Sequence, residues 1–348
     1  MKQRSIEVVP RDTFTRRFAS DVATMPENLC LVGYSEDADV WFVAPEAVRE
    51  NAAFLHRVPS TLRFLTYDVL PRLPGGSFWF VLCFYDGWRE RIPYADAYAW
   101  VPPGDLDGCG EWQGAAGELP LLSDERRWLA CYGAHRGDPS AVLLPEAHYH
   151  AGEAYAAMFA EVAAQGQPWE ARQLRAVFCA GDHGSVANYF PPVVEGRPHP
   201  RRHLAEIAAA GALPIDVHLG HGVPRAQQMG YRWILDVDGF VRTWDAFAWK
   251  IRSGSVLLSP ASPWESFFTR LFEPWTHFVP VANDFADLAE RLEWCRANDY
   301  ECRQIAQRAR QRAEEVYRPE YVSRVVARQW RRLLEASGPG VATSVPLR

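Results

Sequence analysis

Residues 231–260 read YRWILDVDGFVRTWDAFAWKIRSGSVLLSP and hold the clearest structural pattern in the chain. The apolar run 231–237 predicts a strand, the Asp-Gly pair that follows predicts a turn, and 243–252 predicts a helix. A second strand is predicted at 255–258. A strand that passes through a glycine turn into a helix directs unpaired backbone N–H groups and the positive end of the helix dipole at one point. The stretch therefore predicts an anion site suited to a diphosphate.

Short apolar runs alternate with helical patterns on both sides of this stretch. Strands are predicted at 29–33, 39–44, 77–85, 97–101, 141–144, 174–179 and 276–281, and helices at 60–69, 151–164 and 203–210. From residue 284 onward apolar residues recur every 3.6 residues, which predicts terminal helices. Alternating strands and helices predict sheets covered on both faces, with ligand at the carboxyl ends of the strands.

Length and composition indicate a two-domain protein. A chain of 348 residues that is 48% hydrophobic exceeds what one core usually holds. We expect an acceptor-side domain at 1–167, a nucleotide-sugar domain at 168–318, a terminal helix at 319–336 and a tail at 337–348. The net charge of −6 gives no general attraction to nucleic acid.

No apolar run reaches the roughly 18–20 residues of a membrane span. The first residues, MKQRSIEVVPRDTFTRR, also lack the apolar core of a signal peptide, so we expect a cytoplasmic protein. The seven cysteines are odd in number and form no CxxC pair, which argues against a disulfide framework and a thiolate zinc site. Most are expected to be small core residues.

Several motifs between residues 225 and 315 carry a family resemblance. They are Asp236-Val-Asp-Gly239, the Trp244 and Lys250 that follow, Ser253-Gly-Ser255, Ser262-Pro-Trp-Glu265 with Phe267-Phe268, and Glu273-Pro-Trp-Thr-His277. In this order they resemble glycosyltransferase family 90, which includes capsule-associated xylosyltransferases, protein O-glucosyltransferases and bacterial lipopolysaccharide-modifying transferases. The spacing is similar to that of the bacterial branch. The match is patchy before residue 225.

The resemblance implies a GT-B-like α/β fold of two Rossmann-type domains, with the C-terminal helix crossing back to the first. It also implies a UDP-sugar donor, a saccharide or lipid-linked glycan acceptor, inversion at the anomeric carbon, and no metal or other cofactor. The donor would be held by Gly181, His183, Arg201, Arg202, Asp238, Gly239, Thr243, Trp244, Lys250 and Glu265.

Within this set Thr243 is expected to cap the helix and Lys250 to reach a phosphate. Arg201 matches a nucleotide-holding arginine of the family, although its neighbour Arg202 leaves the choice between them open. A fixed cation that faces the leaving diphosphate would replace a metal ion. A plain strand-turn-helix with surface lysine and arginine side chains is the simpler interpretation of the same residues.

Two departures from the family pattern concern catalysis. Cys179-Ala-Gly181 replaces the Arg-Gly turn of family members, and Ala52 stands where the O-glucosyltransferases carry a catalytic aspartate. An inverting transfer needs a base at the acceptor hydroxyl. Asp86 is the first candidate because it ends the apolar strand 78–85, and Glu50 and Glu146 follow. A relative that binds a nucleotide or glycan without turnover is the rival interpretation, and a transferase for a protein or small natural product is a third.

Two further residue groups have simpler interpretations. His148-Tyr-His150 with Glu153, and His218 with His221, are of ligand type, but no second cluster completes either set, so no metal site is predicted. Nine arginines crowd the terminal helices and suggest peripheral contact with an anionic inner membrane surface. Interleaved glutamates favour ion-paired, solvated helices instead.

The choice of base generates a direct test. We expect Asp86→Asn to lower turnover roughly 100-fold or more, the usual contribution of a general base, and to leave UDP affinity nearly unchanged. Steady-state kinetics with Glu50→Gln and Glu146→Gln in parallel make the comparison. Full activity in Asp86→Asn, with loss in one of the glutamate variants, would assign the proton transfer to that glutamate.

Overall fold

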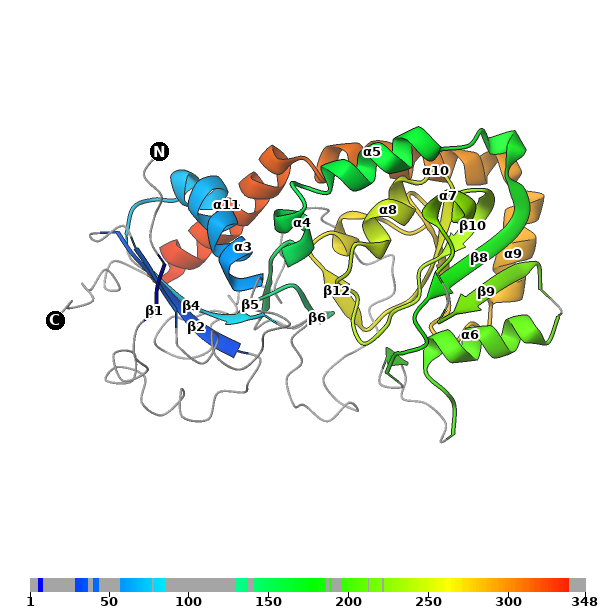
Figure 1. The fold of residues 1–348 in the computed structure, drawn as a ribbon, viewed down its shortest axis with the longest axis horizontal. Coiled ribbons are helices and arrows are strands. Elements are labelled where there is room, and N and C mark those ends of the chain that lie inside the picture. The colour runs from blue at the N-terminus through cyan, green and yellow to red at the C-terminus, as the bar shows by residue number, and fades with distance from the viewer. Residues whose placement is uncertain are drawn as a thin grey trace. The chain divides into compact units, whose positions relative to one another are not determined.

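The computed structural model describes residues 6–8, 29–36, 40–43, 57–76, 78–84, 129–136, 141–185, 188–189, 196–211, 213–220 and 222–337 (Figure 1). These residues fall into two compact units. One is drawn from Met1–Arg89, Glu111–Ala151 and Pro319–Arg348, and the other from Gly152–Arg318. Each unit has its own sheet, and the α/β class predicted from the sequence is confirmed. The predicted domain ranges stay a prediction.

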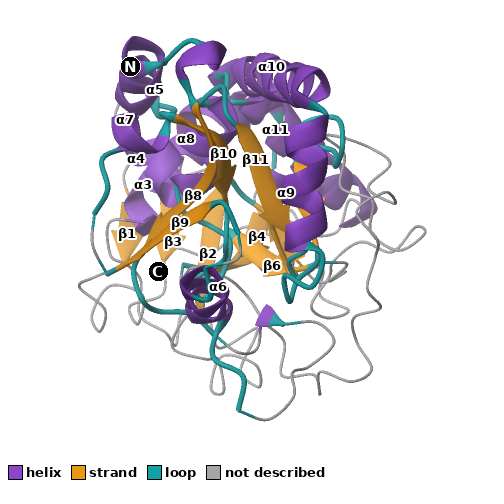
Figure 2. Cartoon of the chain, turned by 90° about the vertical axis from the view of Figure 1, so that its right-hand side faces the viewer, coloured by secondary structure: helices purple, strands orange, loops and turns teal. Residues whose placement is uncertain are grey.

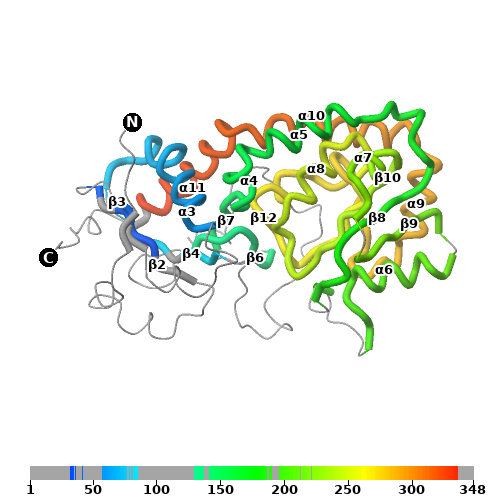
Figure 3. The backbone as a smooth tube through the Cα atoms, viewed as in Figure 1, coloured from blue at the N-terminus to red at the C-terminus, as the bar shows by residue number. Residues whose placement is uncertain are grey.

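The second unit is built on a five-stranded sheet in which every pair is parallel. Its strands are β8 (Gln173–Ala180), β9 (Ile215–Leu219), β10 (Tyr231–Leu235), β11 (Val256–Pro260) and β13 (Val279–Val281). They lie in the order β13-β11-β10-β8-β9. The trace in Figure 3 follows the chain from β8 through α6 to β9 and then back through α7 to β10.

Helices cover both faces of this sheet, as parallel strands require. They are α5 (Ala156–Gln165), α6 (Pro200–Ala209), α7 (Arg225–Gln228), α8 (Ala246–Arg252), α9 (Leu288–Ala297) and α10 (Asp299–Val316). Figure 2 shows α7 and α8 on one side of the strands and α9 on the other. Short 3-10 turns at Trp169–Ala171 and Thr269–Leu271 and the short strand β12 (Trp264–Ser266) complete the described part of the unit.

The core of the second unit follows from this covering. All five residues of β11 are buried, because a strand flanked by helices on both faces has no solvent side. Trp233 of β10, Phe178 of β8 and Leu258 of β11 are fully or almost fully buried in one cluster. Leu288 of α9 and Ile305 of α10 join the same cluster.

The strand order determines where a ligand would bind. Numbered along the chain, the five strands run 2-1-3-4-5, the doubly wound order whose direction reverses between the first and third strands. Here these strands are β8 and β10. The connections from their carboxyl ends leave in opposite directions, which opens a crevice at that edge. The strand ends at Ala180 and Leu235 therefore mark the expected ligand position.

The first unit has a mixed sheet in the order β1-β3-β2-β4-β5-β7. The strands are β1 (Ile6–Val8), β2 (Leu29–Ser35), β3 (Val40–Val43), β4 (Phe78–Cys83), β5 (Leu129–Cys131) and β7 (Ala141–Leu143), and β6 (Gly133–His135) lies outside this sheet. Because β2 is antiparallel to β3 and β4, this sheet departs from the all-parallel form that a Rossmann-type domain implies.

The helical part of the first unit consists of α3 (Arg57–Phe64), α4 (Ala147–Ala151) and α11 (Pro319–Ser337). A π-helical turn (Leu65–Val69) and a 3-10 turn (Leu70–Arg72) continue α3. Trp330 of α11 is fully buried, and its ring lies edge-on to Phe78 at 5.5 Å and to Phe80 at 4.9 Å between ring centres. This aromatic cluster attaches α11 to β4.

Three sequence predictions differ from the structure. The helix predicted at 151–164 is interrupted, because Glu153, Ala154 and Tyr155 have positive φ angles, so α4 and α5 are separate. The helix predicted at 243–252 begins only at Ala246. The strands β1, β5, β6, β9 and β12 were not predicted, and the strand predicted at 97–101 lies outside the described residues.

The cysteines and arginines follow the simpler sequence interpretation. Cys83, Cys131, Cys295 and Cys302 are buried. Arginines of α10 pair with glutamates, as in Arg303–Glu170, Arg308–Glu301 and Arg312–Glu315, each at 2.7 Å. This pairing favours solvated helices over a membrane-binding face. Within the described ranges, no helix combines the length and apolar character needed to cross a bilayer.

The aromatic cluster under α11 makes a stability test possible. We expect Trp330→Ala to lower the free energy of unfolding by about 3–5 kcal/mol, because it leaves a cavity between α11 and β4. Tyr300→Ala is the matched control, since Tyr300 is 75% exposed and its loss should change stability by no more than about 0.5 kcal/mol. Chemical denaturation of both variants measures the difference. Equal stabilities would contradict the packing of α11 on β4.

Candidate functional site

Two loops meet at the crevice marked by the strand order. Gly181-Asp182-His183 follows β8, and Asp236-Val237-Asp238-Gly239 follows β10. Helix α6 begins at Pro200, so its first turn lies at the same edge of the sheet. The three segments bring charged side chains and glycine backbone together at the place where a doubly wound fold binds its ligand.

Arg201, in the first turn of α6, joins the two loops. Its Nε donates to the Val237 carbonyl at 3.2 Å, and its Nη1 donates to the Gly181 carbonyl at 3.2 Å. The same Nη1 lies 3.3 Å from Nε2 of His183. Burial lowers the pKa of Arg201, and the carboxylates of Asp238 and Asp236 oppose that shift. The result is a cation positioned at the strand ends by two backbone carbonyl oxygens.

Glycines leave little room to spare where these loops approach one another. A Cβ on Gly239 would lie 3.0 Å from Nη2 of Arg201, and one on Gly181 would lie 2.5 Å from the His183 ring. A Cβ on Gly184 would lie 3.3 Å from the Gly239 carbonyl oxygen. These glycines allow the backbone to approach both the arginine and any ligand that it binds.

Two buried aspartates lie behind the β10 turn. Asp236 accepts from Lys250 Nζ at 2.8 Å and pairs with Arg242 at 3.3 Å. Asp238 pairs with Arg242 Nε at 3.1 Å and accepts a very short hydrogen bond from Ser262 Oγ. Arg242 also donates to the Ser259 hydroxyl at 2.7 Å, which connects the turn to β11.

The two aspartates differ in their electrostatics. Burial acts to raise the pKa of Asp236, but the charges of Lys250 and Arg242 outweigh it, so the pKa lies below the usual value. For Asp238 burial is dominant and raises the pKa despite Arg242 and Ser262. Including Arg201, three cations surround these two carboxylates. The cluster therefore leaves an excess of positive charge beside the strand ends, which favours an anionic ligand.

Further polar contacts hold the outer rim of the site. Arg202 forms a close ion pair with Asp182, and His199 Nε2 lies 3.4 Å from the same carboxylate. Burial lowers the pKa of His199, partly offset by Asp182. The His183 ring stacks on Phe240 with 5.6 Å between centres, and Phe240 is 57% exposed. An exposed aromatic face beside a cationic cluster suits the ring of a base or sugar.

Asparagine side chains position the backbone of the β10 turn. Asn188 Nδ2 donates to the Gly239 carbonyl at 2.6 Å, and its Oδ1 accepts from the Trp264 indole N–H at 2.9 Å. Asn283 Nδ2 in turn donates to the Asn188 carbonyl at 2.9 Å. Because these amides are buried, they hold the Gly239 carbonyl in a hydrogen-bonded network.

The structure brings Gly181, His183, Arg201, Arg202, Asp238 and Gly239 together at this crevice, as the sequence interpretation requires. The capping role assigned to Thr243 is wrong, because Asp245 occupies the N-cap of α8 and the buried Thr243 hydroxyl has no hydrogen-bond partner among the described residues. The assignment of Thr243 to the donor site stays a prediction. Trp244 is 49% exposed and Glu265 is partly buried. Their assignment to the donor site stays a prediction.

Lys250 occupies a different environment from the one the sequence suggested. Its side chain is 4% exposed, its ammonium is paired with Asp236, and Nζ lies 5.6 Å from the centre of the Phe178 ring. An ammonium buried in this way neutralises a carboxylate beneath the turn. The geometry supports an indirect role for Lys250, which holds the turn in place, in preference to direct phosphate contact.

The candidate bases are not tested by this geometry. Asp86 and Glu50 lie outside the described residues. Glu146 is buried and precedes α4 in the first unit. The assignment of the base stays a prediction.

No group of three or more His, Cys, Asp or Glu side chains is arranged to hold a metal ion in the described ranges. His150, one of the ligand-type residues, stacks on Phe64 at 4.2 Å between ring centres and lies 3.1 Å from the Pro145 carbonyl. Burial lowers the pKa of His150 to about 3. This histidine is therefore a neutral, partly buried residue that packs against Phe64.

Sequence reasoning missed Arg242, Asn188 and Asn283. Arg242 lies inside the quoted 231–260 stretch, four residues after Asp238, a spacing that signals an ion pair. No local signal identifies the two asparagines, since Asn188 is distant in sequence from Gly239, Asn283 is distant from Asn188, and each pair meets only after folding.

Comparison with known proteins gives the family. The profile described as glycosyl transferase family 90 matches residues 156–334, just over half of the 348-residue chain. The chain belongs to glycosyltransferase family 90. This confirms the family expected from the motifs, whereas membership of the bacterial branch stays a prediction.

Similar proteins match only a part of the chain. Uncharacterized protein 035R of Invertebrate iridescent virus 3 is 39% identical over 89 residues, which cover 24% of this chain and 8% of that protein. Human protein O-glucosyltransferase 3 is 30% identical over 89 residues, which cover 26% of this chain and 17% of that protein. The matches thus span less than a fifth of either relative.

Among solved structures, Anabaena HepE in complex with UDP-glucose has a TM-score of 0.31 and 11% identity. The match covers 50% of this chain and 44% of HepE. HepE with UDP gives a TM-score of 0.30 at 12% identity and covers 52% of this chain and 45% of HepE.

The buried pair of Lys250 and Asp236 generates a prediction. Lys250→Met should lower the free energy of unfolding by about 3–5 kcal/mol, because it leaves a buried carboxylate short of one cation. Lys250→Met with Asp236→Asn should recover much of this loss. Arg296→Met is the control, since it removes an exposed pair with Glu293 and should cost at most about 1 kcal/mol. Denaturant unfolding compares the four proteins.

The pH dependence gives a second measure of the same pair. In the wild-type protein the lowered pKa of Asp236 contributes stability above the usual aspartate pKa, which is lost as the pH falls through the lowered value. Without Lys250, burial favours the protonated acid, so the variant should gain stability as the pH falls toward about 4. Parallel stability–pH profiles for both proteins would contradict the pairing.

Proposed function

We propose that the second unit binds a UDP-sugar at the crevice between β8 and β10, and that the protein transfers the sugar to a saccharide hydroxyl with inversion. Family membership supports the reaction class, and the strand order and charge distribution support the position of the donor. We further propose that the reaction needs no metal and serves the synthesis of lipopolysaccharide, capsule or a related glycan in the cytoplasm.

The position of Arg201 is the observation that carries this proposal. Its guanidinium is anchored to the Val237 and Gly181 carbonyls, which end the two strands at the reversal of the strand order. These acceptors are neutral, so the charge of Arg201 is not cancelled by a direct carboxylate partner among the described residues. A diphosphate placed against Gly239 and this guanidinium would receive charge-assisted hydrogen bonds.

The reaction follows from this arrangement. The acceptor oxygen attacks the anomeric carbon as the bond from that carbon to the UDP oxygen breaks, and the acceptor proton passes to a carboxylate base. Negative charge grows on the departing diphosphate. Arg201, fixed before the reaction, stabilises that charge without reorganisation, which is the usual source of the largest rate effect. Lys250 and Arg242 keep Asp236 and Asp238 from opposing it.

The rim supplies a place for the rest of the donor. The exposed Phe240 stacks one face of its ring on His183, and His183 in turn lies beside the Arg201 guanidinium. Stacking of a uracil or sugar ring on such a face typically contributes about 0.5–1.5 kcal/mol beyond the buried area. The human relative's name, protein O-glucosyltransferase 3, makes a protein hydroxyl the second acceptor to test.

Calorimetry with UDP tests the position of the donor. Arg201→Gln should weaken UDP binding by about 1.5–3 kcal/mol, as expected for the loss of a charge-assisted hydrogen bond. Arg175→Gln is the matched control, because it removes an arginine of β8 that pairs with Asp216 and does not belong to the crevice. Equal UDP affinity in the wild type and Arg201→Gln would remove Arg201 from the donor site.

Turnover separates the enzyme from a non-catalytic relative. The protein would be incubated with a panel of UDP-sugars and saccharide acceptors, and UDP release measured with and without chelator. Release that is insensitive to chelator supports the proposed reaction. Tight UDP binding without release on any acceptor would favour a nucleotide-binding protein without turnover.

A further inference from the structure

A second cationic site lies at the opposite edge of the parallel sheet. A cavity of about 240 Å³ lies beside the ends of α5 and α8 and along α10, and it is lined by Val162, Ala163, Gly166, Gln167, Pro168, Arg172, Arg252, Ser253 and Arg310. Three of these nine residues are arginines and none is acidic. Arg172 directly precedes β8, so the cavity lies at the amino end of the strand whose carboxyl end carries the donor site.

Arg172 is a buried cation without a carboxylate partner among the described residues. The residue is 7% exposed. Its Nε and Nη2 donate to the Gln167 carbonyl at 3.1 and 2.9 Å, Nη2 also donates to the Ser253 carbonyl at 3.1 Å, and Nη1 donates to Ser255 Oγ at 2.6 Å. All these partners are neutral. A buried guanidinium that lacks an opposite charge is costly, and an anion in the adjoining cavity would offset that cost.

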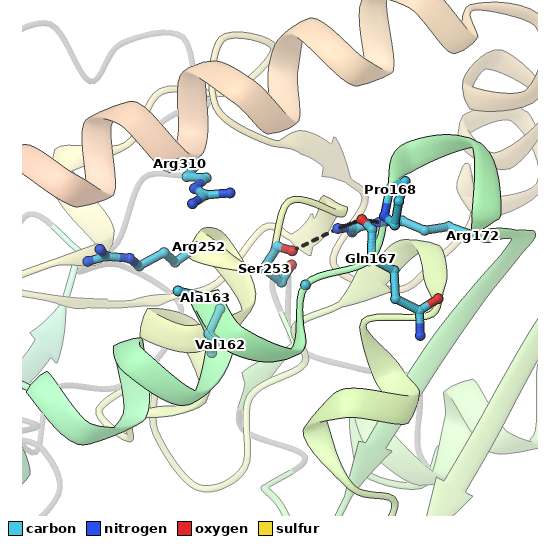
Figure 4. Close-up of a pocket in the computed structure, with 9 residues that line it drawn as sticks. Val162, Ala163, Gln167, Pro168, Arg172, Arg252, Ser253 and Arg310 are labelled. Carbon is cyan, nitrogen blue, oxygen red and sulfur yellow. Dashed lines mark hydrogen bonds between the residues drawn. The ribbon is translucent and has the colours of Figure 1, made fainter.

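Arg310 brings a second guanidinium to the same space. Figure 4 shows its side chain descending from α10 toward Ser253, with Arg172 on the far side of that serine. Burial and the charge of Arg310 together lower the pKa of Arg172 to about 10. The two guanidinium groups repel each other across the cavity, and an anion bound between them would offset that repulsion.

The third arginine, Arg252, ends α8 and lies over the Phe159 ring at 4.3 Å. One carboxylate serves both surface arginines: Glu314 lies 4.0 Å from Arg252 and 3.2 Å from Arg310. Three positive charges therefore face one negative charge. The cavity retains an excess of two positive charges, and the Arg310 hydrogen bond to Glu314 uses only its Nε.

Helix ends explain a part of this arrangement. Arginines commonly bind the free carbonyls at helix C-termini. Arg172 binds the Gln167 carbonyl just after α5 and the Ser253 carbonyl at the end of α8. This accounts for the orientation of Arg172. It does not account for Arg310, which comes from α10 and, within the described ranges, donates to Glu314 rather than to a carbonyl at either helix end.

We propose that this cavity is a binding site for the phosphate group of a small molecule, held by Arg310 and Arg172 with Arg252 at its margin. Guanidinium groups present several N–H donors in a fixed plane, which match phosphate oxygens better than a single ammonium would. The volume accommodates a phosphate and part of the molecule that carries it. The site is separate from the donor crevice, since the eight residues of β8 place the two about 25 Å apart.

The test is a calorimetric titration of the full chain with inorganic phosphate in a buffer free of other multivalent anions. Arg310→Gln and Arg252→Gln are the test variants, because both side chains are partly exposed and their loss should leave the fold intact. Arg303→Gln, an exposed arginine of the same helix, is the matched control. We expect Arg310→Gln to weaken phosphate binding at least about tenfold and Arg303→Gln to leave it unchanged.

Arg201→Gln distinguishes this site from the donor crevice. Phosphate binding that survives in Arg201→Gln and is lost in Arg310→Gln supports the proposal, whatever the result with UDP. Binding that is lost in Arg201→Gln and kept in Arg310→Gln overturns it, because the phosphate then occupies the crevice.

Vesicle flotation identifies the source of the phosphate. Vesicles of phosphatidylcholine with phosphatidic acid carry the same group on a lipid. If the protein floats with these vesicles and the Arg310→Gln variant does not, the site binds a lipid phosphate. If the protein binds inorganic phosphate in the titration but does not float with the vesicles, the site binds a soluble phosphate. Failure of the wild-type chain to bind phosphate in either form overturns the proposal.

Discussion

The buried charge network behind the β10 turn is the constraint on which the candidate site depends. Lys250 comes from α8, Arg242 from the loop before it, and both neutralise aspartates that directly follow β10. Arg242 also reaches Ser259 at the end of β11. The turn is thereby fixed to the neighbouring strand and helix. At Gly239 the turn lies directly against the Arg201 guanidinium.

This arrangement separates structural charges from functional ones. A buried ion pair contributes little net stability, because desolvation offsets much of the attraction, but the loss of one partner is costly. Such a network therefore specifies a conformation more than it stabilises the fold. Arg201 differs because it donates to two backbone carbonyls, which are neutral acceptors. The cation that is free to act on a ligand is the one that no carboxylate directly neutralises.

The parallel sheet of the second unit presents two edges with different chemistry. At the carboxyl edge the reversal between β8 and β10 gathers glycines and Arg201, in keeping with membership of glycosyltransferase family 90. At the amino edge Arg172 joins the segment before β8 to the end of α8, and Arg310 lies near it on α10. A strand with a cationic site at each end offers a rigid connection between them.

Much of the second unit could be predicted from the sequence because its signals are local. The apolar runs of β8, β10, β11 and β13 and the glycine turn after β10 are readable from a few adjacent residues. The motifs also identified the family. Strand β9 was missed because Ile215–Leu219 carries charged and polar residues on an edge strand, where burial no longer marks the pattern.

The sequence by itself determined the α/β class, the family and the segments that form the crevice. Only the tertiary structure decided the strand order, the pairing of Lys250 with Asp236, and the contact of Arg201 with Val237 and Gly181. The physical reason is that the charge of a lysine or arginine is visible in the sequence, whereas its partner is not. Which cation is neutralised within the fold and which remains available to a ligand depends on long-range packing.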